Sequence, residues 1–165
     1  MKIKIGFGVD VHQLVAERDL IVGGVKIPSE LGALGHSDAD VLLHSICDAM
    51  LGALNLRDIG FHFSDQDPKY KNIDSSILLK DTYKLVKEKG FVLGNLDATV
   101  ILEQPKLNPH IPAMQKKIAE LLETDIDNVS IKATTHEKVD SFGTQKALKA
   151  YVVCLLEKWH FDSAQ

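Results

Sequence analysis

Apolar and polar residues alternate along the N-terminal segment from Lys2 to His12. The odd positions from Ile3 to Val11 are apolar, whereas the even positions are lysine, glycine, aspartate or histidine. Side chains alternate between the two faces of a strand, so this pattern predicts a strand. Its last two even positions, Asp10 and His12, then project to the same side, opposite the apolar face. A carboxylate and an imidazole two residues apart can grip one ion, but two ligands do not make a site.

Three segments carry apolar residues at helical spacing. The first helix is predicted over residues 38–54, with Ser37 as its N-cap. The second is predicted over residues 76–89 and ends at Gly90, a glycine typical of the position just after a helix. The third is predicted over residues 111–122 and has prolines near its first turn.

Strands are predicted over residues 96–102, 129–133 and 148–158, and a hairpin over residues 20–27. Residues 55–72 form a long polar stretch, which predicts a loop; loops of this length in compact domains are usually functional or disordered. Because helices and strands are interspersed after an early hairpin, the pattern predicts an α/β or α+β class with a mixed or antiparallel sheet.

The chain has 165 residues with 45% hydrophobic content, which predicts a single domain over residues 1–165. The net charge of −4 argues against a nucleic-acid groove, although a small phosphorylated ligand is compatible if a metal supplies positive charge. Cys47 and Cys154 are predicted to be reduced core residues of a cytoplasmic protein, with a disulfide as the alternative. The sequence predicts no membrane span, and no signal or transit peptide is expected because Met1 leads directly into the first predicted strand.

A third candidate metal ligand, His44, lies on the first predicted helix. With Asp10 and His12 it makes a set of two histidines and one carboxylate, which suits catalytic Zn²⁺ with a vacant fourth position; Mn²⁺ or Fe²⁺ are alternatives. Asp40 and Asp48 lie one turn to either side of His44, so either carboxylate is predicted to accept a hydrogen bond from its second ring nitrogen. The alternative is a solvated helix face with an ordinary histidine.

Three further segments have side chains suited to phosphate or cation binding. His36-Ser37-Asp38 precedes a helix, where free backbone amides attract anions; the alternative is an ordinary N-cap. Residues 58–68 mix acids, aromatics and glycine, and so predict either a loop that closes over a ligand or a solvated connection. Residues 132–138 end a strand with hydroxyl groups, which suit phosphate oxygens, and with Glu137, which suits Mg²⁺; the alternative is a polar strand end.

These motifs, in this order, resemble the 2-C-methyl-D-erythritol 2,4-cyclodiphosphate synthase family of the non-mevalonate route to isoprenoids. The similarity covers nearly the whole chain. It is carried by GVDVH (8–12), GGVKIP (23–28), HSDADV (36–41), DIG (58–60), FSDQDP (63–68), PK (105–106), PHIP (109–112) and KATTHEK (132–138).

The resemblance implies an α+β fold (an α/β sandwich) whose mixed, mostly antiparallel sheet has helices on one face. It also implies a homotrimer with a site at each subunit boundary. The expected reaction is that of a lyase: the 2-phosphate of 4-diphosphocytidyl-2-C-methyl-D-erythritol attacks the β-phosphorus of the same molecule, a cyclic diphosphate forms and CMP leaves.

Residue by residue, the resemblance implies zinc ligands at Asp10, His12 and His44, and a second cation, Mg²⁺ or Mn²⁺, at Glu137. His36 and Thr135 match positions that steady the transition state. Substrate contacts are implied at Ser37, Asp58, Gly60, Phe63, Asp65, Asp67, Lys106 and Thr134, with Lys106 in the cytidine pocket.

One segment, residues 139–147, departs from the family pattern. The family usually has Leu-Gly-Phe-Thr-Gly-Arg-Gly-Glu-Gly here, and this chain has Thr144 and Lys146 where the arginine and glutamate stand. In the family this segment lines a central channel that can hold a diphosphate-bearing isoprenoid, so ligand binding there is an open question for this chain. Two rival functions follow: a zinc-dependent phosphohydrolase with the same three ligands, and a non-catalytic trimeric module that binds isoprenoid or metal.

Overall fold

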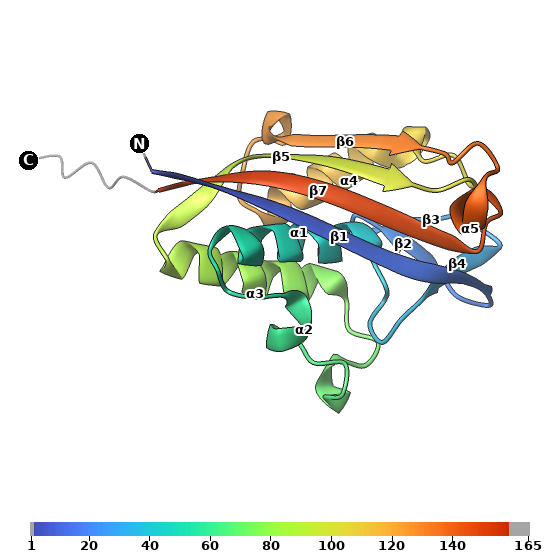
Figure 1. Ribbon diagram of the computed structural model, residues 1–165, viewed down its shortest axis with the longest axis horizontal. Helices are drawn as coiled ribbons and strands as arrows, with labels where there is room; N and C mark the ends of the chain where they lie inside the picture. The colour runs from blue at the N-terminus through green and yellow to red at the C-terminus, as the bar shows by residue number, and fades with distance from the viewer. Residues whose placement is uncertain (1, 159–165) are drawn as a thin grey trace, which may run out of the picture.

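A computed structural model describes residues 2–158 of the chain (Figure 1). Met1 and residues 159–165, which form the ends of the predicted domain over 1–165, lie outside the described part. The described residues form a five-stranded sheet with the order β4-β1-β7-β5-β6. Its strands are β1 (Ile3–Ala16), β4 (Leu31–Leu34), β5 (Phe91–Ile101), β6 (Val129–Thr134) and β7 (Ala147–Lys158).

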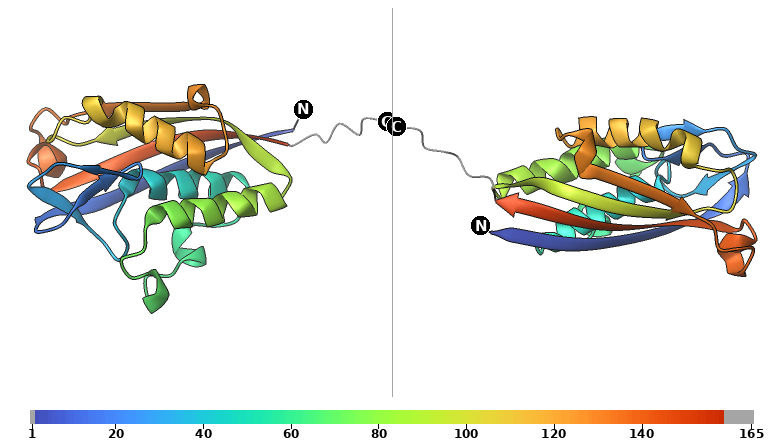
Figure 2. Two further views of the ribbon diagram at one scale, coloured as in Figure 1. Left: turned by 180° about the vertical axis from the view of Figure 1, so that it is seen from behind. Right: turned by 90° about the horizontal axis from the view of Figure 1, so that it is seen from above.

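Neighbouring strands in this sheet are antiparallel, except that β5 and β6 run parallel. The long helices α1 (Val41–Ala53), α3 (Ser75–Glu88) and α4 (Ile111–Leu121) lie on one side of the sheet (Figure 2). The expectation of an α+β fold with a mixed, mostly antiparallel sheet and helices on one face is therefore confirmed. Within residues 2–158, no helix combines the length and the apolar character that crossing a membrane requires.

The core lies between the sheet and these helices. Helix α1 packs on β1 and β7, α3 packs on α1 and β5, and α4 packs on β6. Fully buried side chains of this core include Leu43, Ile46, Val100, Met114 and Val152. Cys47 and Cys154 are both buried in this core as free thiols.

The hairpin predicted over residues 20–27 is confirmed as β2 (Leu20–Val22) and β3 (Val25–Ile27), with Gly23 and Gly24 in the left-handed region that their turn requires. The N-cap of α1 differs from the prediction. It is Asp40, not Ser37, because the Asp40 carboxylate accepts hydrogen bonds from the backbone of Leu42 and Leu43.

Other boundaries also differ from the predictions. The polar stretch 55–72 contains a one-turn helix, α2 (Ile59–His62), and the 3₁₀ turn η1 (Pro68–Tyr70). The remaining short helices are α5 (Asp140–Gly143) in the segment that departs from the family pattern, η2 (Asn108–His110) and η3 (Ile126–Asn128). Strand β5 starts five residues before the prediction, directly after Gly90, and passes a bulge at residues 93–95.

The two faces of β1 have opposite surroundings. The even positions face α1 at very short range: a Cβ at Gly6 would lie 1.8 Å from the carbonyl oxygen of Ala49, and one at Gly8 would lie 2.0 Å from that of Ser45. The helix backbone therefore rests directly on the strand, and this close packing leaves the next even positions, Asp10 and His12, beside the helix that carries His44.

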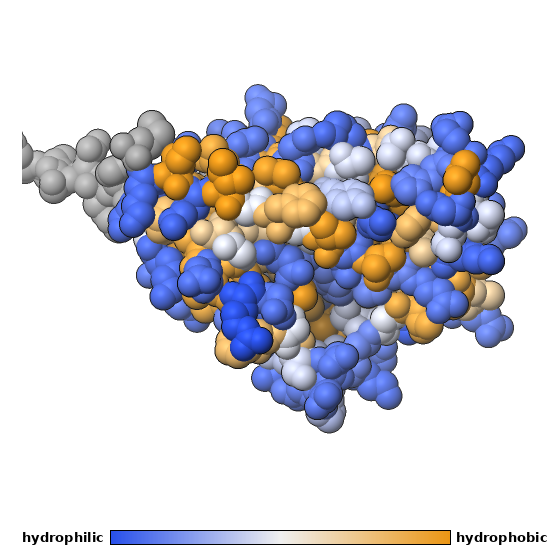
Figure 3. All heavy atoms as spheres, in the orientation of Figure 1, coloured by the Kyte–Doolittle hydropathy of each residue, from blue (hydrophilic) through white to orange (hydrophobic). Residues whose placement is uncertain are grey.

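The odd positions of β1 lie on the opposite face of the sheet, which no helix within residues 2–158 covers. Figure 3 shows apolar side chains gathered over β1 and β7 on this face. Their exposed fractions are large for apolar residues in a sheet: Ile3 46%, Ile5 67%, Phe7 61%, Val11 50% and, on β7, Val153 47%. A patch of this kind in a folded protein marks an interaction surface.

Candidate metal centre and adjoining cavities

Three donor atoms from two elements converge beside the N-terminal half of α1. Nε2 of His12 and Nδ1 of His44 lie 2.9 Å and 3.0 Å from Oδ2 of Asp10, and the two nitrogens are 3.2 Å apart. Donors placed about 2 Å from a tetrahedral ion lie roughly 3.3 Å from one another, so this spacing fits a metal of that geometry. Within the described residues, this is the cluster of histidine and carboxylate groups that can hold a metal ion.

The outer ring nitrogens of both histidines have partners that fix the tautomers. Nδ1 of His12 lies 3.1 Å from the carbonyl oxygen of Leu34, which can only accept, so this nitrogen donates. Nε2 of His44 lies 2.8 Å from Oγ of Ser75. That hydroxyl donates to the carboxylate of Asp38, so it accepts from His44. Both inner nitrogens are thus left with a lone pair for a cation, which is how ligating histidines are usually held.

The partner of His44 is not one of the two carboxylates predicted from helical spacing. The Asp40 carboxylate is fully buried and also accepts hydrogen bonds from the turn amides of Gly23 and Gly24. Oδ1 of Asp48 accepts from the backbone of Ile59 at 2.7 Å and so holds the start of α2. The prediction that Asp48 or Asp40 orients the His44 ring is corrected accordingly: Asp40 and Asp48 fix the backbone around the site.

Asp10 and His44 shift each other's pKa values toward the charged forms. Burial alone would raise the pKa of Asp10, but the hydrogen bonds and charges of His12 and His44 outweigh it and hold the pKa well below its usual range. Burial alone would lower the pKa of His44, but the hydrogen bond and charge of Asp10 raise it above its usual value. A carboxylate that stays ionised in this way is suited to cation binding.

A cavity of about 330 Å³ opens beside this cluster. His12 and His44 form part of its wall. The predicted site residues His36, Ser37, Gly60, Phe63 and Asp65 line it as well, together with Ile59, Tyr70, Ile73 and Leu78, which were not predicted. Its wall thus combines imidazoles and a hydroxyl on one side with apolar side chains on the other, a surface suited to a small molecule with anionic and hydrocarbon parts.

A separate cavity of about 320 Å³ lies near the opposite edge of the sheet, at the C-terminal end of β6. Among the predicted site residues it is lined by Lys106, Thr134 and Thr135. No described residue lines both cavities. Strands β7 and β5 separate β1 from β6, a distance of about 14 Å at ordinary strand spacing. A single chain therefore does not bring His36 and Thr135 into one site.

The remaining predicted residues make local contacts. Oε1 of Glu137 accepts a hydrogen bond from the Thr135 hydroxyl at 2.9 Å, away from the three converging donors. Asp58 caps α2. Asp67 caps the 3₁₀ turn after α2 with its side chain, while its carbonyl oxygen lies 3.4 Å from Nε2 of His36.

Sequence reasoning missed two kinds of site residue. Ser75 reaches His44 from the N-terminus of α3, 31 positions along the chain, and helical spacing on α1 gives no sign of it. The apolar wall of Ile59, Ile73 and Leu78 resembles ordinary core sequence. Its one available signal was that Ile59 lies in the polar loop predicted to close over a ligand, while Ile73 and Leu78 follow that loop in the sequence.

Comparisons with known proteins agree with these observations. A family model, the YgbB family, matches residues 3–157. The 2-C-methyl-D-erythritol 2,4-cyclodiphosphate synthase of Parabacteroides distasonis is 58% identical over 158 residues, which are 96% of this chain and 98% of that protein. A protein of the same name from Geobacter sulfurreducens is 57% identical over 156 residues, 94% of this chain and 99% of its own length.

Solved structures give the same picture. The IspF–CDP complex from Plasmodium falciparum is 37% identical with a TM-score of 0.85, and the match covers 96% of this chain and 97% of that one. The bifunctional IspDF from Campylobacter jejuni is 41% identical with a TM-score of 0.92; the match covers 96% of this chain but 43% of that longer one. The family expected from the sequence motifs is thereby confirmed, and the chain belongs to the YgbB family.

Proposed function

We infer that this chain is an enzyme that cyclises 4-diphosphocytidyl-2-C-methyl-D-erythritol 2-phosphate to 2-C-methyl-D-erythritol 2,4-cyclodiphosphate, with release of CMP. This is a phosphorus–oxygen lyase reaction of non-mevalonate isoprenoid synthesis. The observation that carries the proposal is the convergence of Asp10, His12 and His44 beside a cavity of mixed polarity, in a chain 58% identical to a synthase of that name.

The residues present suit this chemistry. The nucleophile is a phosphate oxygen that is already ionised at neutral pH, so the site needs positioning and charge neutralisation and not a strong base. Zn²⁺ held by Asp10, His12 and His44 would supply Lewis acidity toward a diphosphate oxygen. In the same cavity, His36 and Ser37 are placed to donate hydrogen bonds to phosphate oxygens.

The far cavity is assigned to the nucleotide end of the substrate. Lys106 supplies a positive charge there, and the hydroxyl groups of Thr134 and Thr135 suit phosphate oxygens. Glu137, bonded to Thr135, is proposed to hold Mg²⁺ or Mn²⁺. One substrate can reach both cavities only if they come from neighbouring subunits.

We therefore also propose a homotrimer in which the β6 side of one subunit meets the β1 side of the next. The uncovered apolar face of the sheet supports this assembly, because exposed phenylalanine, isoleucine and valine side chains are stabilised when a partner removes them from water. Sedimentation of the purified chain is expected to give three times the monomer mass, and a monomer at micromolar concentration would contradict the proposal.

The continuous core of residues 2–158 supports treating the chain as one domain.

The activity is tested by incubating the chain with the cytidyl substrate, Zn²⁺ and Mg²⁺, and identifying the products by ³¹P NMR. CMP and a cyclic diphosphate are expected. Linear phosphates in their place would indicate a phosphohydrolase. Absence of turnover in a fully metal-loaded protein would indicate a non-catalytic module. His12→Ala serves as the matched variant, because it is expected to remove metal binding and turnover while the trimer persists.

A further inference from the structure

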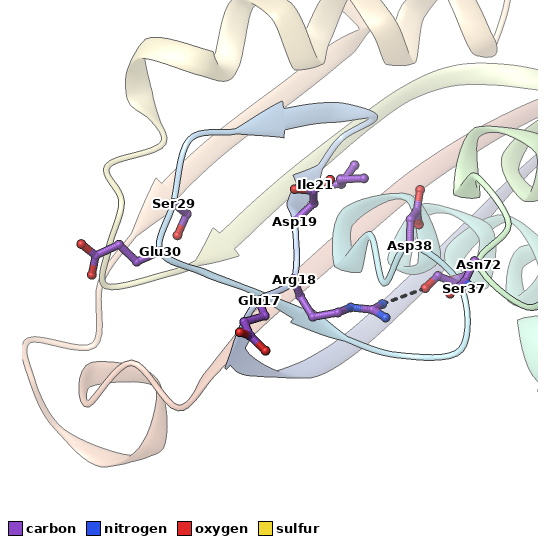
Figure 4. A pocket seen from close by; sticks show the side chains of 9 residues that line it. All are labelled: Glu17, Arg18, Asp19, Ile21, Ser29, Glu30, Ser37, Asp38 and Asn72. Carbon is purple, nitrogen blue, oxygen red and sulfur yellow. Dashed lines mark hydrogen bonds between the residues drawn. The ribbon is translucent and has the colours of Figure 1, made fainter.

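A third cavity, of about 530 Å³, shares one wall with the site just described. Its lining includes Arg18, Asp19, Glu30 and Ser37 (Figure 4). Ser37 also lines the cavity beside the metal centre, so the backbone around Ser37 separates the two spaces. The side chain of Arg18 extends from the turn after β1 toward this backbone (Figure 4).

The Arg18 guanidinium contacts three alternate carbonyl groups of the segment Ala33–Ser37. Its Nε donates to the carbonyl oxygen of Ala33 at 3.3 Å, and its Nη2 donates to those of Gly35 at 3.4 Å and Ser37 at 3.2 Å. A planar guanidinium with five N–H donors can bind several acceptors at once, which a lysine ammonium on its flexible stem does less well.

The fold fixes the place from which Arg18 acts. A Cβ at Gly32 would lie 2.2 Å from the carbonyl oxygen of Arg18 and 2.3 Å from that of Asp19. Only a glycine at position 32 allows the turn after β1 to pack this tightly on β4. The backbone of Arg18 is therefore held against the strand that leads into the segment.

The same segment orients both histidines of the metal centre. The carbonyl oxygen of Leu34 accepts from Nδ1 of His12, and Gly35 packs so closely on that ring that a Cβ there would lie 3.1 Å from its Cε1 atom. Oγ of Ser37 lies 3.2 Å from Nε2 of His44. His36, between them, faces the substrate cavity.

We propose that Arg18 is a positioning residue of the metal centre, which acts by holding the Ala33–Ser37 segment against His12 and His44. Arg18 supplies none of the three converging donor atoms and does not line the substrate cavity. The proposal rests on the metal centre of the proposed function, and it adds a structural element that neither the sequence motifs nor the spacing of the ligands indicates.

The test measures metal affinity without substrate, so that it stands apart from the cyclisation assay. The metal-stripped full chain and its variants are titrated with Zn²⁺ against a chromophoric chelator. Co²⁺ absorption spectra report coordination geometry, and thermal unfolding reports stability. Arg18→Met keeps the aliphatic stem and removes the donors, Arg18→Lys keeps the charge, and Glu30→Gln is the matched control in the same cavity.

We expect Arg18→Met to weaken Zn²⁺ binding about tenfold or more, in line with the loss of an outer hydrogen bond at a metal site, and to alter the Co²⁺ spectrum. Arg18→Lys is expected to lose affinity severalfold, and Glu30→Gln to match the wild type. A residue that only stabilised the fold would lower the unfolding temperature and leave affinity and spectrum unchanged. Wild-type affinity in Arg18→Met, or in Arg18→Lys should the first variant not fold, would overturn the proposal.

Discussion

Replacing Gly8 with alanine should destabilise the protein and also move His44 away from Asp10 and His12. The added Cβ would lie 2.0 Å from the carbonyl oxygen of Ser45 and 2.7 Å from the backbone nitrogen of Ala49. Ordinary contacts of a Cβ begin near 3.4 Å. Both clashing atoms belong to the backbone of α1, so no change of side-chain rotamer can relieve the contact, and the helix must move away from β1 by about 1 Å or more.

The size of the effect follows from where the ligands lie. His44 is on α1, next to the clashing Ser45, whereas Asp10 and His12 follow Gly8 on β1. A metal site keeps its function only while its ligands stay within about 0.5 Å of their proper places, and the required movement exceeds that. We expect a loss of about 1–3 kcal/mol in the free energy of unfolding from overpacking, and at least a tenfold loss of Zn²⁺ affinity.

Urea unfolding of the metal-free protein and Zn²⁺ titration of the folded protein measure the two effects separately. Gly52→Ala is the matched control: it lies on the same helix, and its added Cβ would have no atom within 4 Å apart from its chain neighbours and the helix's own backbone. This control is expected to stabilise the protein by about 0.5–1 kcal/mol, because alanine is the better helix former. If Gly8→Ala kept wild-type stability and Zn²⁺ affinity, the direct packing of α1 on β1 would be wrong.

Three further predictions concern residues around the site. Ser75→Ala removes the hydroxyl that accepts from His44, and Zn²⁺ titration should show about a tenfold weaker affinity; an unchanged affinity would exclude this orienting role. Burial raises the pKa of Asp40 from 3.8 to about 6, so the folded state binds this proton more tightly than the unfolded state. The free energy of unfolding should therefore fall as pH rises from about 4 to 6; Asp40→Asn should flatten that slope in urea titrations, and an identical slope would refute the assignment. Glu137→Gln should raise the Mg²⁺ concentration needed for half-maximal turnover, and an unshifted Mg²⁺ titration would remove Glu137 from that role.

The sequence predicted the side-chain directions at the metal centre because strand alternation is local. Asp10 and His12 had to share a face of β1 whatever the rest of the chain did. The hydrogen-bond partners of these ligands could not be predicted from the sequence, because Ser75 and Leu34 contact the histidines only through tertiary structure. Spacing on a helix tells which residues are neighbours on its surface, but not which other element lies over them.

The same limit explains the wrong N-cap at α1 and the question that the pattern of β1 left open. Ser37 was a sound N-cap by residue type, but Asp40 takes that place because the Gly23-Gly24 turn brings two more donors to its carboxylate. In β1 the alternating pattern predicted two faces without saying which face the helices cover. In the structure α1 covers the face with Gly6 and Gly8, since only glycines admit a helix backbone so close, and the apolar side chains of the other face are exposed.

The carboxylate of Asp40 joins two parts of the chain that would otherwise open separately. It accepts from two amides of the hairpin turn and from two amides at the start of α1. The turn cannot lift away without leaving the first turn of the helix unpaired in a buried place, so the two should open as one cooperative unit in amide exchange. His44 lies four residues beyond Asp40, and the hairpin therefore belongs to the same unit as the metal centre.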